Sequence, residues 1–167
     1  MDIPWQVSDE AINELVFEFL EGKWSIRRRF EGTYSGEFTG EATFAPDKDD
    51  GSVYHYAEQG GLTDAEGQRF DAKQSYRYRL SEGQLQVLKR EASDWIVMHD
   101  LDFRNDDGIA TASHRHLCGQ DDYATVYRVD LSGNLEVDYR VSGPKKDYRI
   151  HSLYTRQRRA TRICFSR

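Results

Sequence analysis

The spacing of apolar residues changes once along the chain, near residue 22. Before that point they recur every three or four positions and form one stripe, made of Ile12, Leu15, Val16, Phe19 and Leu20. This spacing is typical of an amphipathic helix that covers a core with one face. We therefore predict a helix over residues 8–20, with Ser8 as its N-cap and Gly22 at its C-terminal end.

After residue 22 the apolar period becomes two, which is the period of a strand with one buried face. Alternating runs occur at 24–30, 37–44, 53–60, 68–80, 84–91, 94–104, 108–118, 122–131, 134–142 and 147–158. The segments between them are short and carry turn residues such as Gly, Asn, Asp and Pro. The pattern predicts a mainly β fold of roughly ten antiparallel up-and-down strands with one N-terminal helix. Such a meander closes into a barrel or folds into a sandwich, and closure removes exposed strand edges.

Length and charge narrow the class of protein. The chain has 167 residues, 38% of them hydrophobic, and a net charge of −6. We expect one domain over 1–167, with the barrel at about 22–158 and a basic tail at 159–167. The acidic balance argues against nucleic acid as a partner, although residues 156–167 contain five arginines and no acid. A solvated tail is the simpler interpretation of those arginines.

Targeting signals are not evident in the sequence. The first residues lack the basic start and apolar run of a signal peptide, and no apolar stretch approaches the roughly 20 residues of a membrane helix. The two cysteines, Cys118 and Cys164, are too few for a disulfide scaffold. We therefore expect a cytoplasmic protein without a membrane partner; the oligomeric state stays open.

Several motifs resemble known β-barrels. A helix followed by Gly22-Lys23-Trp24 resembles the start of the lipocalin-like (calycin) barrels, in which the first-strand Trp packs against an Arg of the last strand; the resemblance assigns that role to Arg156. Most of the chain is similar to a family of small uncharacterised proteins with a lipocalin-like barrel and no established activity. The similar stretches are residues 19–24, 40–44, 56–60, 99–102, 116–123, 143–148 and 154–156. The resemblance implies a fold and supplies no chemistry.

Alternation also predicts which side chains face inward. One face of each strand collects tyrosines, histidines, an acid and an arginine, whereas a solid core would be built from Leu, Ile, Val and Phe. Because buried hydroxyls need partners, such an interior favours a hydrated or ligand-filled cavity. The candidate ligand-binding residues are Arg28, Tyr56, Glu58, Tyr76, Tyr78, His99, His116, Cys118, Tyr123, Tyr127, Tyr148 and Arg156. A buried Arg28 must be paired, and Glu58 is a candidate partner. Trp95, Val97 and His99 are expected on one side of their strand.

The spacing His114-x-His116-x-Cys118 puts three zinc-ligand types on one side of a strand. No second cluster of cysteines reinforces a metal site. One inward histidine and a buried thiol explain the pattern more simply, so we predict no metal and no cofactor. Haem is a lesser alternative, since the glycine-rich signature of haem-carrying relatives is missing.

Three functions remain open. The first is binding of a small, partly polar or aromatic molecule in the barrel. The second is acid–base catalysis of an isomerase, cyclase or hydrolase type, with Glu58, His99 and His116 as candidate catalytic residues. In an enzyme of this type, Glu58→Gln should abolish turnover and leave the melting point nearly unchanged. The third is a non-enzymatic interaction scaffold.

Overall fold

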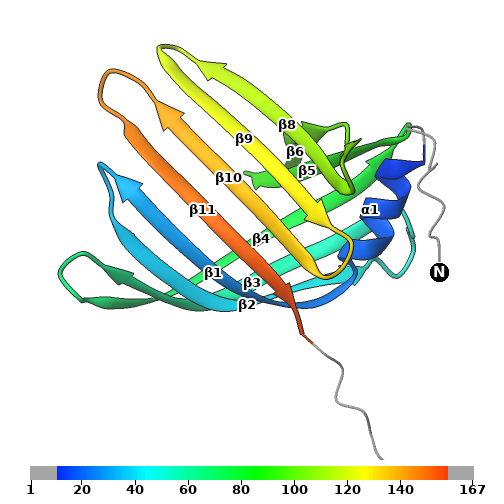
Figure 1. Ribbon diagram of the computed structural model, residues 1–167, viewed down its shortest axis with the longest axis horizontal. Coiled ribbons are helices and arrows are strands. Elements are labelled where there is room, and N and C mark those ends of the chain that lie inside the picture. Colours follow the sequence, from blue (N-terminus) through cyan, green and yellow to red (C-terminus); the bar gives the residue numbers. More distant parts are fainter. Residues whose placement is uncertain (1–10, 158–167) are drawn as a thin grey trace, which may run out of the picture.

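The computed structural model describes residues 11–157 and shows one helix against one end of a curled antiparallel sheet (Figure 1). The helix α1 spans Ile12–Leu20. The expected N-cap Ser8 and the basic tail 159–167 lie outside the described residues. Gly22 begins the first strand with a φ of 121°, a value that favours glycine, so it serves the turn out of the helix. No helix within residues 11–157 is long and apolar enough to span a membrane.

Within residues 11–157, eleven strands follow the helix, so the mainly β prediction is confirmed. They are β1 Gly22–Gly32, β2 Gly36–Pro46, β3 Val53–Asp64, β4 Arg69–Ser81, β5 Gln84–Glu91, β6 Asp94–Leu101, β7 Arg104–Asp106, β8 Ile109–Cys118, β9 Asp121–Asp130, β10 Asn134–Ser142 and β11 Asp147–Arg156. The predicted run 94–104 is two strands, because the chain leaves the ladder at residues 102–103. There the Phe103 amide donates to the side chain of Asn13 on α1, at 2.7 Å.

The sheet is a meander that opens at one seam. Its order is β6-β5-β4-β3-β2-β1-β11-β10-β9-β8-β7, with the first and last long strands joined by β1–β11 pairing. The seam therefore falls between β6 and the β7–β8 hairpin. Across it, the Asp100 amide donates to Nδ1 of His114 at 3.3 Å. The result is a curled half-barrel, with α1 at one end and an open mouth at the other (Figure 1).

The helix end of the barrel has an aromatic core. Phe17 of α1 stacks on Tyr54 of β3 with ring centroids 3.9 Å apart. Trp24 is fully buried, and its indole N–H donates to the Leu20 carbonyl at 2.9 Å. The Arg156 guanidinium lies 4.4 Å from the Trp24 ring, which confirms the first-strand–last-strand contact that the resemblance implied. These contacts attach α1 to both ends of the strand meander.

A register shift between Val87 and Leu88 interrupts the β5–β6 ladder. Met98 of β6 is the extra, unpaired residue opposite this shift. Because of this bulge, the residues of β6 before and after Met98 alternate out of phase. His99 is buried, whereas Val97 is 43% exposed and Trp95 stacks against Arg77 of β4, at 4.3 Å. The prediction that Trp95 and Val97 share a side with His99 is therefore wrong.

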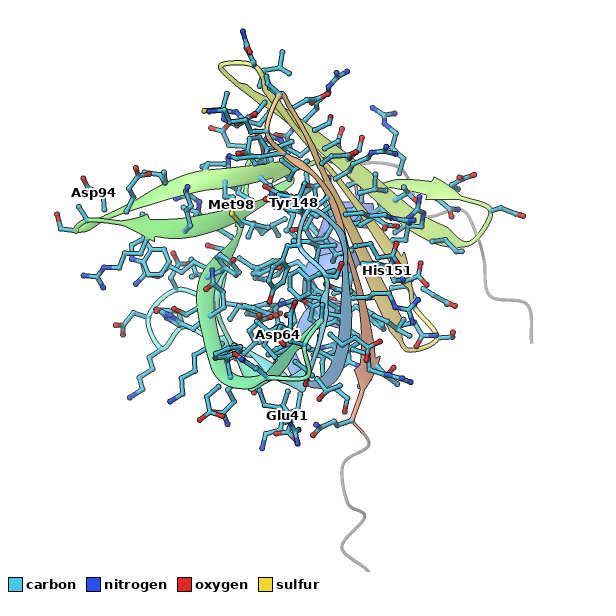
Figure 2. The ribbon with its side chains drawn as sticks, turned by 90° about the vertical axis from the view of Figure 1, so that its left-hand side faces the viewer. Glu41, Asp64, Asp94, Met98, Tyr148 and His151 are labelled. Atoms are coloured by element: carbon cyan, nitrogen blue, oxygen red, sulfur yellow. The ribbon has the colours of Figure 1, made fainter. Side chains whose placement is uncertain are left out.

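Figure 2 looks into the mouth and shows the β5–β6 hairpin projecting away from the barrel, with Asp94 at its tip and Met98 nearer its root. The ladder explains this projection. β4 pairs with β5 only from Arg77 to Ser81, so the first half of β4 has β3 as its partner on one side alone. Residues 89–91 of β5 pair only with β6. The barrel wall consequently has a gap between the first half of β4 and the outer end of this hairpin.

Candidate functional site

The barrel encloses a hollow of about 380 Å³. Its walls combine two kinds of side chain. The apolar and aromatic part consists of Phe30, Phe38, Leu62, Ala72, Met98, Val137 and Ile150. The polar part consists of Arg28, Tyr56, Glu58, Lys73, Gln74, Tyr76, Tyr78, His99, Tyr127, Tyr139, Ser152 and Tyr154. This volume falls within the roughly 300–1,000 Å³ of small-molecule sites.

An ion pair lies at the centre of the polar part. Arg28 of β1 donates from its two terminal nitrogens to the two carboxylate oxygens of Glu58 on β3, at 2.7 and 2.9 Å. β2 lies between these strands, with Phe38 opposite Arg28 and Ala42 opposite Glu58; Gly40 is the same-face residue between them, so no side chain separates the pair. Both charged side chains are mostly shielded, at 17% and 6% exposure. The expected pairing of Arg28 with Glu58 is confirmed.

Neighbouring hydroxyl groups make most of the other hydrogen bonds of this pair. Nε of Arg28 donates to Ser152 at 2.7 Å, and Nη2 donates to the Tyr154 hydroxyl at 3.1 Å. The Tyr56 hydroxyl bonds the Glu58 carboxylate and lies 3.0 Å from the Tyr154 hydroxyl. Four of the five guanidinium N–H groups are engaged in this way, and each carboxylate oxygen accepts at least one bond. The side chains of Arg28, Glu58, Tyr56, Tyr154 and Ser152 therefore form one hydrogen-bonded network in the wall of the hollow.

Burial and the network act on pKa values in opposite directions. Burial alone would lower the pKa of Arg28, but the hydrogen bonds and charge of Glu58 outweigh it and raise that pKa above its ordinary value. Burial raises the pKa of Tyr56 well above its ordinary value. Arg28 is therefore cationic and Tyr56 a neutral hydrogen-bonding group. The interior acquires no net charge from the ion pair.

His99 lies on the other side of the hollow. Its Nδ1 is 2.8 Å from the Tyr127 hydroxyl, and its Nε2 is 3.4 Å from the Thr125 hydroxyl. Burial, and then the nearby His114, lower the pKa of His99 to about 4. The imidazole is neutral near pH 7 and held by two partners. Neutral His99 adds polarity to the wall without adding charge.

Two half-buried tyrosines, Tyr76 and Tyr139, also line the hollow. Tyr76 is half-buried, its ring stacks with that of Tyr56 at 5.8 Å, and its hydroxyl accepts from Nε2 of Gln74. Tyr139 is half-buried on β10, and burial raises its pKa to about 12. Both therefore remain protonated phenols that can give or accept a hydrogen bond from a guest in the hollow.

Some expected site residues lie elsewhere. His116 and Cys118 continue the inward alternation of β8 but are exposed, because the outer end of β8 pairs only with β9 and has no strand on its seam side; the prediction of a buried thiol at Cys118 is therefore wrong. Tyr123 and Tyr148 lie near the mouth but do not line the hollow. The Tyr123 hydroxyl accepts from Lys146, at 2.8 Å.

Arg156 also lies away from the hollow, at the helix end. Its guanidinium donates to the carbonyls of Phe19 and Glu21, next to the end of α1. Arg156 therefore joins the last strand to the end of α1 and to Trp24, in agreement with the packing role that the resemblance implied.

The histidine–cysteine pattern does not form a cluster. His114 faces His99, with ring centroids 5.6 Å apart, while His116 packs near Tyr123 at 6.3 Å. Among residues 11–157 no three His, Cys, Asp or Glu side chains are grouped to hold a metal ion. Glu58, His99 and His116 are likewise not joined by a hydrogen bond, since Glu58 and His99 bond the separate partners described above.

Sequence reasoning missed part of the lining. Met98 enters because of the β6 bulge, which the alternating pattern conceals. Phe38 is placed by two glycines: a Cβ on Gly40 or Gly60 would come within 2.8–2.9 Å of its ring tip. Those glycines stand opposite each other in the β2–β3 ladder, and paired glycines on adjacent strands are a readable signal for a close-lying ring.

Comparisons with known proteins support the fold. Residues 20–156 match the family model described as Family of unknown function (DUF6314). Rv2717c from M. tuberculosis superposes with a TM-score of 0.63 and 13% identity, over 92% of this chain and 100% of that one. An S-type phycobiliprotein lyase, CPES from Guillardia theta, superposes with a TM-score of 0.63 and 10% identity, over 95% and 100%. No curated protein matches the sequence.

Proposed function

We propose that this chain, which belongs to the Family of unknown function (DUF6314), binds a small, partly polar or aromatic molecule inside its barrel. The observation that carries the proposal is the 380 Å³ hollow itself, which has aromatic and aliphatic walls around an internally neutralised polar network. Apolar walls with a few directed polar groups are the usual composition of small-molecule sites.

The charge balance of the hollow determines which part of a ligand can be buried inside it. Arg28 is compensated by Glu58, and His99 is neutral near pH 7. Lys73 is exposed at the edge of the hollow, where it also lines the neighbouring groove. Deeper in the hollow, a charged group would lose its hydration without gaining a free counter-charge. The body of the guest is therefore uncharged, with rings that pack against Tyr76 and Phe30 and hydroxyl or carbonyl groups that meet Tyr139.

The structural neighbours are compatible with this use of the fold. One of them is named a phycobiliprotein lyase, and at 10% identity it supports the barrel architecture alone. The binding function consequently rests on the lining of this chain's own hollow.

A direct test uses N-phenyl-1-naphthylamine, an uncharged aromatic dye that fluoresces in apolar surroundings. Wild-type protein should bind it saturably. Ala72→Trp places an indole in the hollow and should weaken binding by about tenfold or more. Val137→Phe fills the hollow from another strand and gives an independent check. The matched control is Ala45→Trp, at an exposed position of β2.

Circular dichroism and the melting temperature establish that each variant folds. Equal dye binding by wild type, both filled variants and the control would place the dye outside the hollow and contradict the proposal. A thermal-shift screen of small metabolites then identifies natural guests, because a ligand that binds only the folded state raises its stability.

A further inference from the structure

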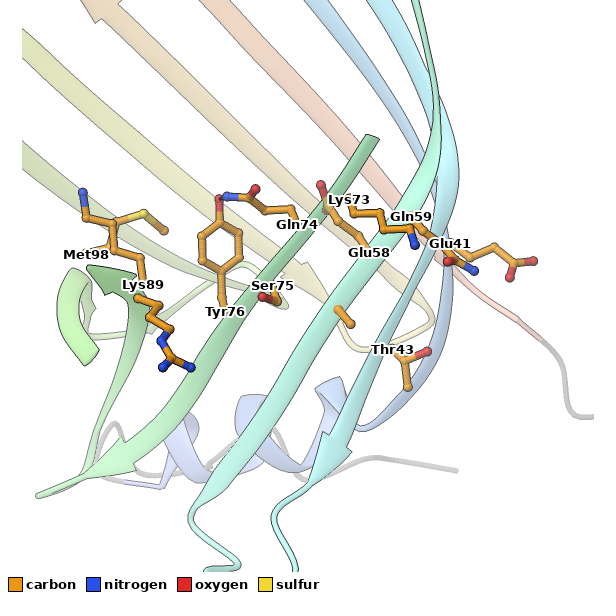
Figure 3. A pocket seen from close by; sticks show the side chains of 12 residues that line it. Glu41, Thr43, Glu58, Gln59, Lys73, Gln74, Ser75, Tyr76, Lys89 and Met98 are labelled. Atoms are coloured by element: carbon orange, nitrogen blue, oxygen red, sulfur yellow. Dashed lines mark hydrogen bonds between the residues drawn. The ribbon is translucent and has the colours of Figure 1, made fainter. Parts of the chain in front are cut away.

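A second, wider groove of about 760 Å³ adjoins the hollow on the side of β4. The two share five lining residues, namely Glu58, Lys73, Gln74, Tyr76 and Met98. The groove therefore meets the interior at these side chains. Figure 3 shows Tyr76 of β4 and Met98 of β6 on the two sides of this junction, with Gln74 beside the Tyr76 hydroxyl.

The backbone leaves this junction open. The hydrogen-bonded ladder between β4 and β5 begins at Arg77 and Leu88, so Tyr76 has no strand partner on the β5 side. Side chains alone separate the groove from the hollow there. Gln74 is exposed and Tyr76 is half-buried. Their side chains can change rotamer while the backbone hydrogen bonds between β3 and β4 stay in place.

Positive charge gathers in the outer groove. Lys73 of β4 and Lys89 and Arg90 of β5 line it, and all three are exposed. Among residues 11–157, none of the three takes part in an ion pair. Two acids also line the groove: Glu58 is neutralised by Arg28, whereas Glu41 keeps its negative charge and accepts from the uncharged amide of Gln157 at 3.2 Å, so three cations face one uncompensated acid. The groove has a local excess of cations on a chain whose net charge is −6.

We propose that the gap between β4 and the β5–β6 hairpin is a lateral entrance to the barrel, and that Lys73 and Lys89, one on each side of it, attract an anionic group on the ligand there. The ligand class is an aromatic or apolar molecule with a carboxylate or another anionic substituent at one end. Its uncharged body enters past Tyr76 and Met98, and its charged end stays in the solvated groove. This inference rests on the proposed binding function and adds the entrance and the charge of the ligand.

The free-energy cost of desolvating the anion favours its position in the groove over burial in the barrel. Inside the barrel, Arg28 already donates four of its five guanidinium N–H groups to Glu58, Ser152 and Tyr154, and its charge is compensated by Glu58. In the groove, an anion keeps part of its hydration and is attracted by exposed ammonium groups on flexible stems, Lys89 on the Met98 side of Tyr76 and Lys73 on the other (Figure 3). Because these lysines are exposed, their contribution is moderate and sensitive to salt.

The test compares two dyes that share one ring system. 8-Anilinonaphthalene-1-sulfonate carries an anionic sulfonate, and N-phenyl-1-naphthylamine lacks it. Each is titrated into wild type, Lys73→Gln/Lys89→Gln and the control Lys23→Gln/Lys48→Gln. Both double variants remove two positive charges from exposed lysines, but Lys23 and Lys48 lie outside the groove.

We expect Lys73→Gln/Lys89→Gln to bind the sulfonate dye about three- to tenfold more weakly and the uncharged dye as well as wild type does. The control should bind both dyes normally. Raising ionic strength from about 20 to about 300 mM should weaken only the sulfonate dye, which tests the charge effect without any substitution. Ala72→Trp should weaken both dyes, because both rings occupy the hollow.

The outcomes separate the two proposals. If both dyes bind and neither the lysine variant nor salt affects the sulfonate dye, the entrance assignment is wrong and the cavity function stands. If neither dye binds wild type, the cavity function itself fails, and the entrance fails with it.

Discussion

Arg28 on β1 and Glu58 on β3 meet across β2, with guanidinium–carboxylate distances of 2.7 and 2.9 Å. The pair connects two strands that are not neighbours in the sheet and holds one wall of the hollow in a fixed shape. It also removes net charge from the interior. The proposed preference for an uncharged guest body follows from this relationship.

Glu58→Gln should lower the free energy of unfolding by about 3–5 kcal/mol, because it leaves a largely buried guanidinium without a counter-charge. This differs from the sequence-based expectation that Glu58→Gln leaves stability nearly unchanged. The double variant Arg28→Met/Glu58→Met should recover at least half of that loss, since it removes both charges. Urea unfolding of the wild type and the three variants checks this, with Arg28→Met as the second single variant. Equal stability of Glu58→Gln and wild type would show that the pair does not form.

Gly60→Ala should be strongly destabilising, for steric reasons. A Cβ at Gly60 would lie 2.1 Å from the Thr39 carbonyl oxygen, so the β2–β3 ladder would have to shift, at a cost of about 1–3 kcal/mol or more. Gly51→Ala is the matched control, because a Cβ there meets nothing within 4 Å. Thermal unfolding compares the two. A Gly60→Ala melting temperature equal to that of Gly51→Ala would contradict the close approach of these strands.

Stability should fall as pH drops from about 6.5 to about 4, through His99. Burial lowers the pKa of His99 to about 4, below its ordinary 6.5, so in this window the unfolded chain binds a proton that the folded chain does not. The loss is about 3 kcal/mol at most. The carboxylates of Asp122 and Asp138 have pKa values lowered below 3.8, so the stability that they contribute begins to fall only at the lower end of this window.

Urea unfolding at several pH values checks this dependence in wild type and His99→Asn. The variant lacks the titrating group, so its slope between pH 4 and 6.5 should be smaller. Direct NMR titration of the His99 ring gives its native pKa. An ordinary value near 6.5 would show that the imidazole is hydrated, contrary to its buried position.

Arg156→Ala should lower the free energy of unfolding by about 1–3 kcal/mol, since it removes a cation–π contact with Trp24 and bonds to carbonyls near the end of α1. Arg156→Lys keeps the charge but not the planar fork, so it should recover only part of that loss. Guanidinium chloride unfolding measures both. If Arg156→Ala unfolds as wild type does, the guanidinium contributes nothing to closing the barrel.

The elements that were predictable from the sequence are those that depend on the spacing of apolar residues within one segment. The helix stripe and the strand alternation reflect which face is buried, and turn residues mark the ends. The Arg28–Glu58 pair was also predictable, because a charge on an inward face requires a partner and few acids share that face. The same reasoning placed Tyr56, Tyr76, Tyr78 and Tyr127 in the lining.

The remaining features depend on distant pairing. The bulge at Met98 reverses the face of Trp95 and Val97, and no composition signal marks it. His116 and Cys118 alternate as an inward face should, but the seam leaves no strand opposite them. The gap beside Tyr76 likewise depends on where β5 stops pairing with β4. The period of apolar residues shows which face of a single strand is buried, whereas these features depend on how one strand pairs with another.

The most direct test of the binding site is NMR mapping with N-phenyl-1-naphthylamine. The account predicts that the largest amide shift changes lie at inward positions around the hollow, such as Tyr76, Tyr139 and Ile150, and that the exposed hairpin residues Ile96 and Val97 stay unchanged. Changes confined to that hairpin, or to the outer ends of β8 and β9, would show that the dye binds the surface and that the barrel interior is not its site.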